Sequence, residues 1–102
     1  MIFPFGRIVP YAGAKAALNA MSEGLAEGLG PQVRVNTLMP GTFQTDIAKA
    51  RDLDAVTEDR KQHTALKRVG QPPEIIGAAL LLASDASSYT SGTIIRVDGG
   101  MF

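Results

Sequence analysis

Apolar side chains recur at regular intervals through the first third of the chain. From Tyr11 onward they return every three or four residues, which is the spacing of one helix face. The pattern predicts a helix over residues 11–30, ended by Gly30-Pro31. Gly24 and Gly28 each weaken this helix by up to about 1 kcal/mol relative to alanine, but small side chains let another helix approach closely. The apolar positions are Ala14, Leu18, Met21, Leu25 and Leu29.

Two shorter segments have the composition of strands. Residues 33–39 and 93–97 are rich in β-branched and apolar side chains, and the first run stops at Pro40-Gly41. A strand that follows a helix after so short a link is half of a strand–helix–strand unit, so we expect a parallel sheet with both faces covered. Two strands cannot form such a sheet stably. The sequence therefore predicts an α/β protein whose sheet is incomplete in this chain.

The remaining segments differ in polarity. Residues 42–67 are polar, charged and only loosely periodic, which fits one or two solvated helices. The alternative is a substrate lid, because insertions after the carboxyl end of a strand often cover the ligand crevice. Residues 73–84 are apolar on nearly every side, which predicts a buried helix, with a subunit interface as one location.

Composition excludes several classes of function. The 102 residues form one domain at most, with the 45% hydrophobic and 20% charged residues of an ordinary globular protein. Ten basic and ten acidic side chains cancel, so neither nucleic acid nor a membrane is an expected partner. Cysteine is absent, which excludes disulfides and thiolate metal sites and fits a cytoplasmic protein. No metal site is predicted, and the apolar run at residues 75–83 is far shorter than the roughly 20 residues that cross a bilayer.

Tyr11 and Lys15 are the strongest candidates for chemistry. Four residues apart on a helix, they lie on one face, one turn from each other. A phenol ordinarily titrates near pH 10, but a nearby ammonium favours its anion. The pair is therefore suited to exchanging a proton with an alcohol or carbonyl oxygen.

Five motifs follow one another along the chain. They are Tyr11-x-x-x-Lys15, Val33-Arg-Val-Asn36, Pro40-Gly-Thr-Phe-Gln-Thr-Asp46, Arg68-Val-Gly-Gln-Pro-Pro-Glu74, and Leu82-Ala-Ser-Asp-Ala-Ser-Ser-Tyr89-x-x-Gly92 leading to Val97-Asp-Gly-Gly100. In this order they resemble the C-terminal part of a classical short-chain dehydrogenase/reductase, of the kind similar to 3-oxoacyl-acyl-carrier-protein reductase. The resemblance implies an oxidoreductase that uses NAD or NADP, acts on a carbonyl or secondary alcohol, and assembles as a homo-oligomer, either a dimer or a tetramer.

The resemblance implies catalytic roles for the tyrosine–lysine pair. Tyr11 is expected to be the general acid–base that exchanges a proton with the substrate oxygen during hydride transfer. Lys15 is expected to bond the ribose hydroxyls next to the nicotinamide and to lower the pKa of the tyrosine.

Four further residues match the cofactor-binding motif of the family. Pro40 and Gly41 match the turn that closes over the nicotinamide, and the backbone of Phe43 and the side chain of Thr45 match contacts to its carboxamide. A Pro-Gly turn at the carboxyl end of a strand is also where a doubly wound sheet binds its ligand. The alternatives are a simple turn at Pro40-Gly41 and a helix cap at Thr45.

Several parts of the family pattern have no counterpart in this chain. The glycine-rich phosphate loop, the residue that selects NAD or NADP, the catalytic serine and the catalytic asparagine would all precede Tyr11. The resemblance thus implies the C-terminal half of a doubly wound, parallel-sheet Rossmann fold, with the N-terminal dinucleotide-binding half absent, in a fragment that is inactive alone. The alternative is a non-catalytic family remnant that acts only through oligomerisation, using the helices at 11–30 and 73–84.

Overall fold

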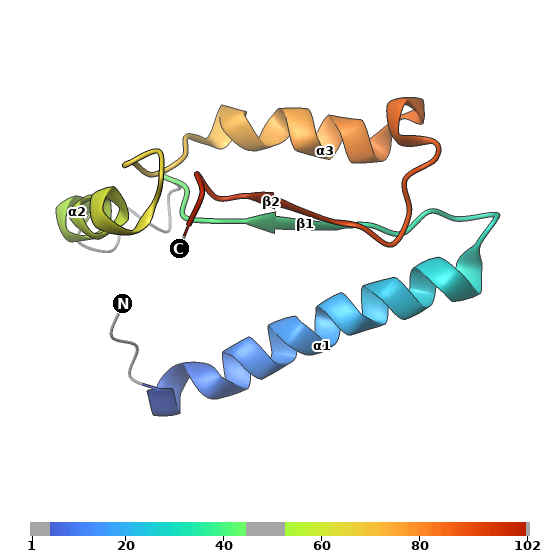
Figure 1. Cartoon of the computed structure of the whole chain (residues 1–102), viewed down its shortest axis with the longest axis horizontal. Coiled ribbons are helices and arrows are strands. Elements are labelled where there is room, and N and C mark those ends of the chain that lie inside the picture. Colours follow the sequence, from blue (N-terminus) through green and yellow to red (C-terminus); the bar gives the residue numbers. More distant parts are fainter. Residues whose placement is uncertain (1–4, 45–52, 102) are drawn as a thin grey trace.

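The computed structural model describes residues 5–44 and 53–101. Figure 1 shows two strands side by side, a long helix and a short helix on opposite sides of them, and another helix at the end to which both strands point. In chain order the elements are α1 (Phe5–Leu29), β1 (Thr37–Pro40), α2 (Leu53–His63), the 3₁₀ turn η2 (Pro72–Ile75), α3 (Ile76–Ala83), the 3₁₀ turn η3 (Asp85–Ser87) and β2 (Ile94–Val97).

The two strands pair in parallel, which confirms the α/β class and the parallel sheet. Thr37 lies opposite Ile94 at one end of the ladder, and Pro40 lies opposite Val97 at the other. The backbone N–H of Gly41 extends the pairing by donating to the carbonyl of Val97 at 2.8 Å. Both strands therefore end at the same edge, so the segments that follow them emerge next to each other.

The observed bounds differ from the predicted ones at several ends. The helix predicted over 11–30 begins six residues earlier, at Phe5, and ends at Leu29. The strand predicted over 33–39 begins four residues later, at Thr37, and ends one residue later, at Pro40. Strand β2 is one residue shorter than its predicted range of 93–97. Residues 33–36 are not in a strand because they bond a loop instead: the carbonyl of Val35 accepts from the N–H of Gly92 at 2.7 Å.

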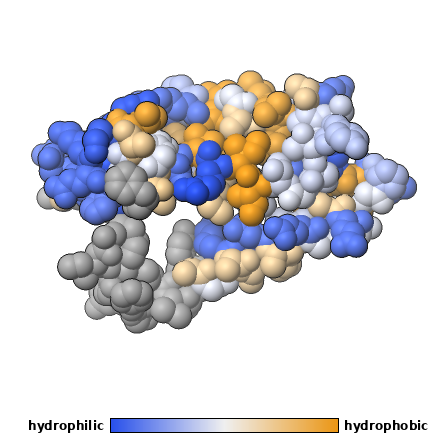
Figure 2. Space-filling view, in the orientation of Figure 1, coloured by the Kyte–Doolittle hydropathy of each residue, from blue (hydrophilic) through white to orange (hydrophobic). Residues whose placement is uncertain are grey.

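The helix predicted over residues 73–84 is present, and within this single chain it is exposed, so its burial in a subunit interface stays a prediction. Its first turn is η2, α3 follows, and neither contains a buried residue. Ile76 is 52% exposed and Leu80 is 62% exposed. Two short strands cover only one side of a helix that is apolar all round, so its outer side faces solvent. Figure 2 shows hydrophobic residues at the surface in the part of the molecule where α3 lies, and hydrophilic ones over α2.

Helix α2 occupies the middle of the region predicted to be a lid over 42–67, and residues 45–52 of that region lie outside the described residues. Within the part of the chain that the structure describes, no helix combines the length and apolar character needed to cross a bilayer.

Arg34 joins the segment before β1 to the end of α3. Its Nη1 donates to Ser87 Oγ at 2.8 Å and to the carbonyl of Thr90 at 3.2 Å. Its Nη2 donates to the carbonyls of Leu82 and Ser84 at 3.4 and 3.2 Å. The carbonyls at the end of a helix have no partner within the helix, so Arg34 supplies the donors that α3 lacks there.

The residues before β2 are bonded to the same segment through Asn36. Its side-chain nitrogen donates to the carbonyl of Thr90 at 3.0 Å, and its side-chain oxygen accepts from the N–H of Thr93 at 3.1 Å. Arg34 and Asn36 therefore fix the loop after α3 and set the start of β2 against the start of β1.

The C-terminal residues hold the segment that follows α2. The N–H of Ala65 donates to the carbonyl of Gly100 at 2.9 Å, and the N–H of Leu66 donates to that of Gly99 at 3.0 Å. Gly100 has a φ of +73°, and a Cβ placed on it would lie 2.8 Å from the Cβ of Ala65. Only glycine fits this conformation and this close approach.

An ion pair fixes the turn between α2 and α3. Arg68 donates from both terminal nitrogens to the Glu74 carboxylate, at 2.7 and 2.6 Å, and Glu74 also accepts from the N–H of Gln71 at 2.7 Å. The Arg68 hydrogen bonds, followed by that of Gln71, lower the pKa of Glu74 from 4.5 to about 2. The same pair raises the pKa of Arg68.

Replacing Arg34 with alanine should lower the free energy of unfolding by about 2–3 kcal/mol, because hydrogen bonds from a charged donor are lost and helix-end carbonyls are left without partners. Urea denaturation measures the change. Arg34→Lys keeps the charge but not the fork of donors, so it should recover less than half of the loss. The control is Lys61→Ala on the exposed face of α2. A change in R34A within about 0.5 kcal/mol of K61A would contradict this role.

The Arg68–Glu74 pair should make stability depend on pH in one window. Because the pKa of Glu74 is lower in the folded chain, its contribution is complete above pH 4.5 and is lost as the pH falls to about 2. Glu74→Gln cannot ionise. The difference in free energy of unfolding between the natural chain and E74Q should therefore be constant near neutral pH and shrink through this window. A difference that does not change with pH would show that the carboxylate contributes nothing through its charge.

Candidate functional site

The predicted site residues come from α1 and from the segment at the carboxyl end of β1. Tyr11 and Lys15 lie on α1, and Pro40 is the last residue of β1. The backbone of Tyr11 is helical, so the four-residue spacing does place the pair one turn apart on the same helix. The side chain of Tyr11 and the whole of Thr45 lie outside the described residues.

A cavity of about 290 Å³ separates α1 from β1. Lys15 and Pro40, two of the predicted cofactor-binding residues, both line it. The other lining residues are Leu18 and Asn19 of α1 and Thr37, Leu38 and Met39 of β1. The hydroxyl of Thr37 is buried and has no hydrogen-bond partner in the protein. The cavity is therefore mostly apolar, with a small number of polar groups in its wall, as in many small-molecule sites.

Sequence reasoning predicted Lys15 and Pro40 but missed the other lining residues, of which Asn19 and Thr37 are the polar ones. Asn19 follows Lys15 by four positions, so the face that carries Tyr11 and Lys15 continues through it, and the same spacing rule would have found it. Thr37 gave no local signal, because its role depends on the helix that lies opposite it.

Gly41 is fixed by its distance from Asp98. A Cβ placed on Gly41 would lie 2.6 Å from the Cβ and 2.7 Å from the Cα of Asp98. A backbone atom cannot give way as a flexible side chain can, so glycine is required at this point of the turn. The Pro40-Gly41 turn is consequently held against the residue that follows β2.

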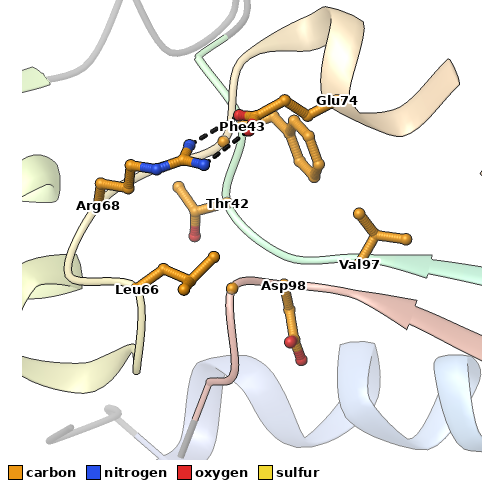
Figure 3. A pocket seen from close by; sticks show the side chains of 9 residues that line it. Thr42, Phe43, Leu66, Arg68, Glu74, Val97 and Asp98 are labelled. Atoms are coloured by element: carbon orange, nitrogen blue, oxygen red, sulfur yellow. Dashed lines mark hydrogen bonds and ion pairs between the residues drawn. The ribbon is translucent and has the colours of Figure 1, made fainter. Parts of the chain in front are cut away.

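The segment after this turn lies beside the residues that lead to α3. The N–H of Gln44 donates to the carbonyl of Gly70 at 2.8 Å, and the N–H of Gly70 donates to that of Thr42 at 2.9 Å. Phe43 thereby lines a second cavity, of about 170 Å³, at the end of both strands. Figure 3 shows this cavity with the bonded Arg68 and Glu74 on one side of it and the side chain of Asp98 pointing away from them. Its lining residues are Thr42, Phe43, Leu66, Arg68, Gly70, Glu74, Val97, Asp98 and Gly99.

Asp98 carries a fixed negative charge at this edge of the sheet. Arg96 donates two hydrogen bonds to its carboxylate, at 3.0 and 2.8 Å, and the backbone N–H groups of Gly100 and Met101 donate two more. The Arg96 guanidinium, with help from these backbone groups, holds the pKa of Asp98 below its usual range. A carboxylate satisfied in this way has a structural role, bonding the C-terminal residues to β2.

The described residues contain no group of three or more His, Cys, Asp and Glu side chains that could hold a metal ion. His63 bonds its own helix, because its Nδ1 lies 2.9 Å from the carbonyl oxygen of Asp59. It lines neither of the two cavities described above.

The structure thus brings together some of the predicted site residues and separates others. Lys15 and Pro40 share the cavity between α1 and β1, whereas Phe43 lines the cavity at the strand ends. Gly41 lies between Pro40 and Phe43 in the chain, so the backbone connects the two cavities there.

Comparison with known proteins gives the same family by sequence. A family described as "Enoyl-(Acyl carrier protein) reductase" matches residues 3–102. The 3-oxoacyl-[acyl-carrier-protein] reductase FabG of Chlamydia trachomatis is 44% identical over 92 residues, which are 89% of this chain and 37% of the relative. The 7alpha-hydroxysteroid dehydrogenase of Escherichia coli K12 is 41% identical over 91 residues, 88% of this chain and 36% of the relative. The chain therefore spans a little more than a third of the length of these relatives.

Solved structures agree with the sequence comparison. A 7 alpha-hydroxysteroid dehydrogenase complexed with NADH and 7-oxo glycochenodeoxycholic acid matches with a TM-score of 0.84 and 39% identity, covering 92% of this chain and 37% of that one. A small-chain dehydrogenase in complex with NADPH matches with a TM-score of 0.72 and 35% identity, over 83% of this chain and 39% of that one. A short-chain dehydrogenase/reductase from Brucella melitensis matches with a TM-score of 0.83 and 33% identity, over 93% of this chain and 38% of that one. This chain belongs to the short-chain dehydrogenase/reductase family of oxidoreductases.

Proposed function

We propose that this chain supplies the proton-transfer pair and the nicotinamide-side contacts of an oxidoreductase that interconverts a carbonyl and a secondary alcohol with NAD or NADP. The observation that carries the proposal is the cavity between α1 and β1, because Lys15 and Pro40 meet there although 25 positions separate them in the sequence. The relatives of this chain are named as reductases and dehydrogenases, and two of the similar solved structures are complexes with NADH or NADPH.

The residues around this cavity fit the nicotinamide riboside part of such a cofactor. Leu18, Leu38 and Met39 offer apolar surface to a flat ring. The Lys15 ammonium has three donors, which suit ribose hydroxyls. The hydroxyl of Thr37 is a buried hydrogen-bonding group that the protein leaves unsatisfied, and such groups usually find a partner in a bound molecule or in water.

In the proposed reaction Tyr11, Lys15 and the Pro40-Gly41 turn have different roles. When bound, the nicotinamide supplies or accepts the hydride. The Tyr11 hydroxyl gives its proton to the carbonyl oxygen during reduction, and its phenolate takes a proton from the alcohol during oxidation. The Lys15 ammonium bonds the ribose hydroxyls and favours the phenolate. Pro40 and Gly41 close the turn over the nicotinamide.

The contacts to the carboxamide are assigned to the backbone of Phe43 and the side chain of Thr45. The 42–67 region, which includes α2, is proposed as the lid over the substrate. Because the chain spans little more than a third of its curated relatives, turnover is proposed for a complete active site of which these residues are one part. Assembly as a dimer or tetramer belongs to the same proposal, and the exposed apolar side of α3 is consistent with it.

Saturable binding of NADH or NADPH by the chain, followed by nicotinamide fluorescence, tests the proposal. Lys15→Ala should weaken binding about tenfold, because it removes charge-assisted hydrogen bonds. Lys61→Ala removes the same charge from an exposed position on α2 and should leave binding unchanged. Equal affinity of K15A and K61A would refute the assignment of Lys15. No saturable binding by the natural chain would favour a family remnant that acts only by oligomerisation.

The role of Tyr11 is best tested in a complete active site. In a chimera, this chain replaces the 92-residue segment of chlamydial FabG that it matches. The chimera should reduce carbonyl substrates, and Tyr11→Phe within it should lower kcat by about 10²–10⁴-fold, the usual contribution of a general acid. Tyr89→Phe is the matched control, since Tyr89 is fully exposed. Retention of kcat by the Tyr11→Phe chimera would exclude Tyr11 as the proton donor.

A further inference from the structure

Two segments far apart in the sequence form a short parallel ladder next to the proposed cofactor site. Residues 42–44 follow the Pro40-Gly41 turn, and residues 69–71 lead into η2. Phe43 and Gly70 pair as an isolated parallel bridge, made by the bonds from Gln44 to Gly70 and from Gly70 to Thr42. Gln71 adds a bond between side chains, from its Nε2 to Gln44 Oε1 at 3.0 Å.

Gly70 is in close contact with the ring of Phe43. A Cβ placed on Gly70 would lie 2.7 Å from Cε1 and 2.9 Å from Cδ1 of that ring. The backbone of Gly70 does not have a positive φ, so alanine could adopt its conformation. Glycine is therefore needed here for space and not for backbone freedom. Any side chain at position 70 must displace Phe43.

The segment that carries Gly70 is itself held firmly. Val69 is buried, and its carbonyl accepts from Arg68 at 3.1 Å. The double hydrogen bond between Arg68 and Glu74 spans the turn, and Glu74 also binds the N–H of Gln71. Because four hydrogen bonds fix the residues on both sides of Gly70, a substitution there displaces Phe43 in preference to the turn.

The opposite end of the 41–44 segment is fixed as well. Gly41 lies against the backbone of Asp98, because a Cβ placed on Gly41 would be 2.7 Å from the Cα of Asp98. The N–H of Gly41 also donates to the carbonyl of Val97. Two close contacts of glycine residues consequently set the path of the chain through Thr42 and Phe43. Gly41 contacts Asp98, the residue after β2, and Gly70 contacts the ring of Phe43.

We propose that Gly70 is a positioning residue for the cofactor site: its lack of a side chain lets Phe43 lie close enough for the 42–44 ladder to form, and this sets the Phe43 backbone that contacts the carboxamide. The contact between the Phe43 backbone and the carboxamide rests on the proposed function. The positioning of Phe43 by Gly70 does not rest on it, because it depends only on the ladder and on the contact between Gly70 and Phe43.

Amide hydrogen exchange followed by NMR tests the positioning without any nucleotide. In Gly70→Ala the amide of Gln44, which donates to Gly70, should exchange at least about tenfold faster, equivalent to about 1.4 kcal/mol. The amides of Thr37 and Gly41, which donate to the carbonyls of Thr93 and Val97, should keep their protection. Gly77→Ala is the matched control, because no atom lies within 4 Å of a Cβ at Gly77.

A double-mutant cycle with Phe43→Ala separates this contact from general damage. Alanine at position 43 removes the ring atoms that a Cβ at position 70 would meet. Gly70→Ala should therefore cost much less in Gln44 protection, and in affinity for NADH or NADPH, when it is added to F43A than when it is added to the natural chain. In the natural background the dissociation constant should rise about tenfold.

The outcomes are distinguishable. Faster Gln44 exchange in G70A with coupling to F43A supports the positioning, and a matching loss of nucleotide affinity supports its role in the cofactor site. Gln44 exchange equal in G70A and G77A overturns the inference. Faster exchange with unchanged nucleotide affinity overturns the link to the cofactor. If neither the natural chain nor the FabG chimera binds nucleotide, the proposed function fails, and the exchange data alone decide the positioning.

Discussion

The close approach of Gly41 to Asp98 is the constraint on which the rest of the structure depends. It exists because β1 and β2 are parallel and end in register, with Pro40 opposite Val97. Two segments leave this point. One runs through Phe43 to the Gly70 ladder, and the other runs through Gly99 and Gly100 to the residues after α2. The Phe43 segment, with its proposed carboxamide contact, and the end of the proposed lid therefore take their positions from a single pair of strand ends.

Polar contacts, more than a hydrophobic core, hold these elements together. Among the described residues, Val69 is the one buried hydrophobic side chain, while Arg60, Thr64 and Ser87 are buried polar ones. Ser87 accepts from Arg34, and the Thr64 hydroxyl donates to the carbonyl of Arg60 at 2.7 Å. Two strands and three helices bury little apolar area, so hydrogen bonds decide how these elements are placed. The exposed apolar sides of α1 and α3 follow from the same shortage of covering surface.

Local patterns predicted the elements and two of the residues that line the cavity between α1 and β1. The spacing of apolar residues gave the helix that ends at Leu29, and the Pro40-Gly41 turn marked the end of β1. The family and the parallel sheet were also recognised correctly. The strand start was wrong because Arg34 and Asn36 bond a loop more than 50 residues away, which no local pattern records. The contact between Gly70 and Phe43 was missed for the same reason. In the sequence Gly70 is only part of a turn, and its importance appears when Phe43 lies beside it.

The pairing of residues 64–66 with 99–101 has a consequence for how the protein can diversify. The region proposed as a lid is held at both ends: Gln44 bonds Gly70 at its start, and Ala65 and Leu66 bond Gly100 and Gly99 at its end. Changes of sequence or length between these attachments need not disturb the strand ends that hold the proposed cofactor contacts. If this region is the lid, its substrate contacts could be exchanged as a module, while Gly99 and Gly100 keep the end of that module attached next to β2.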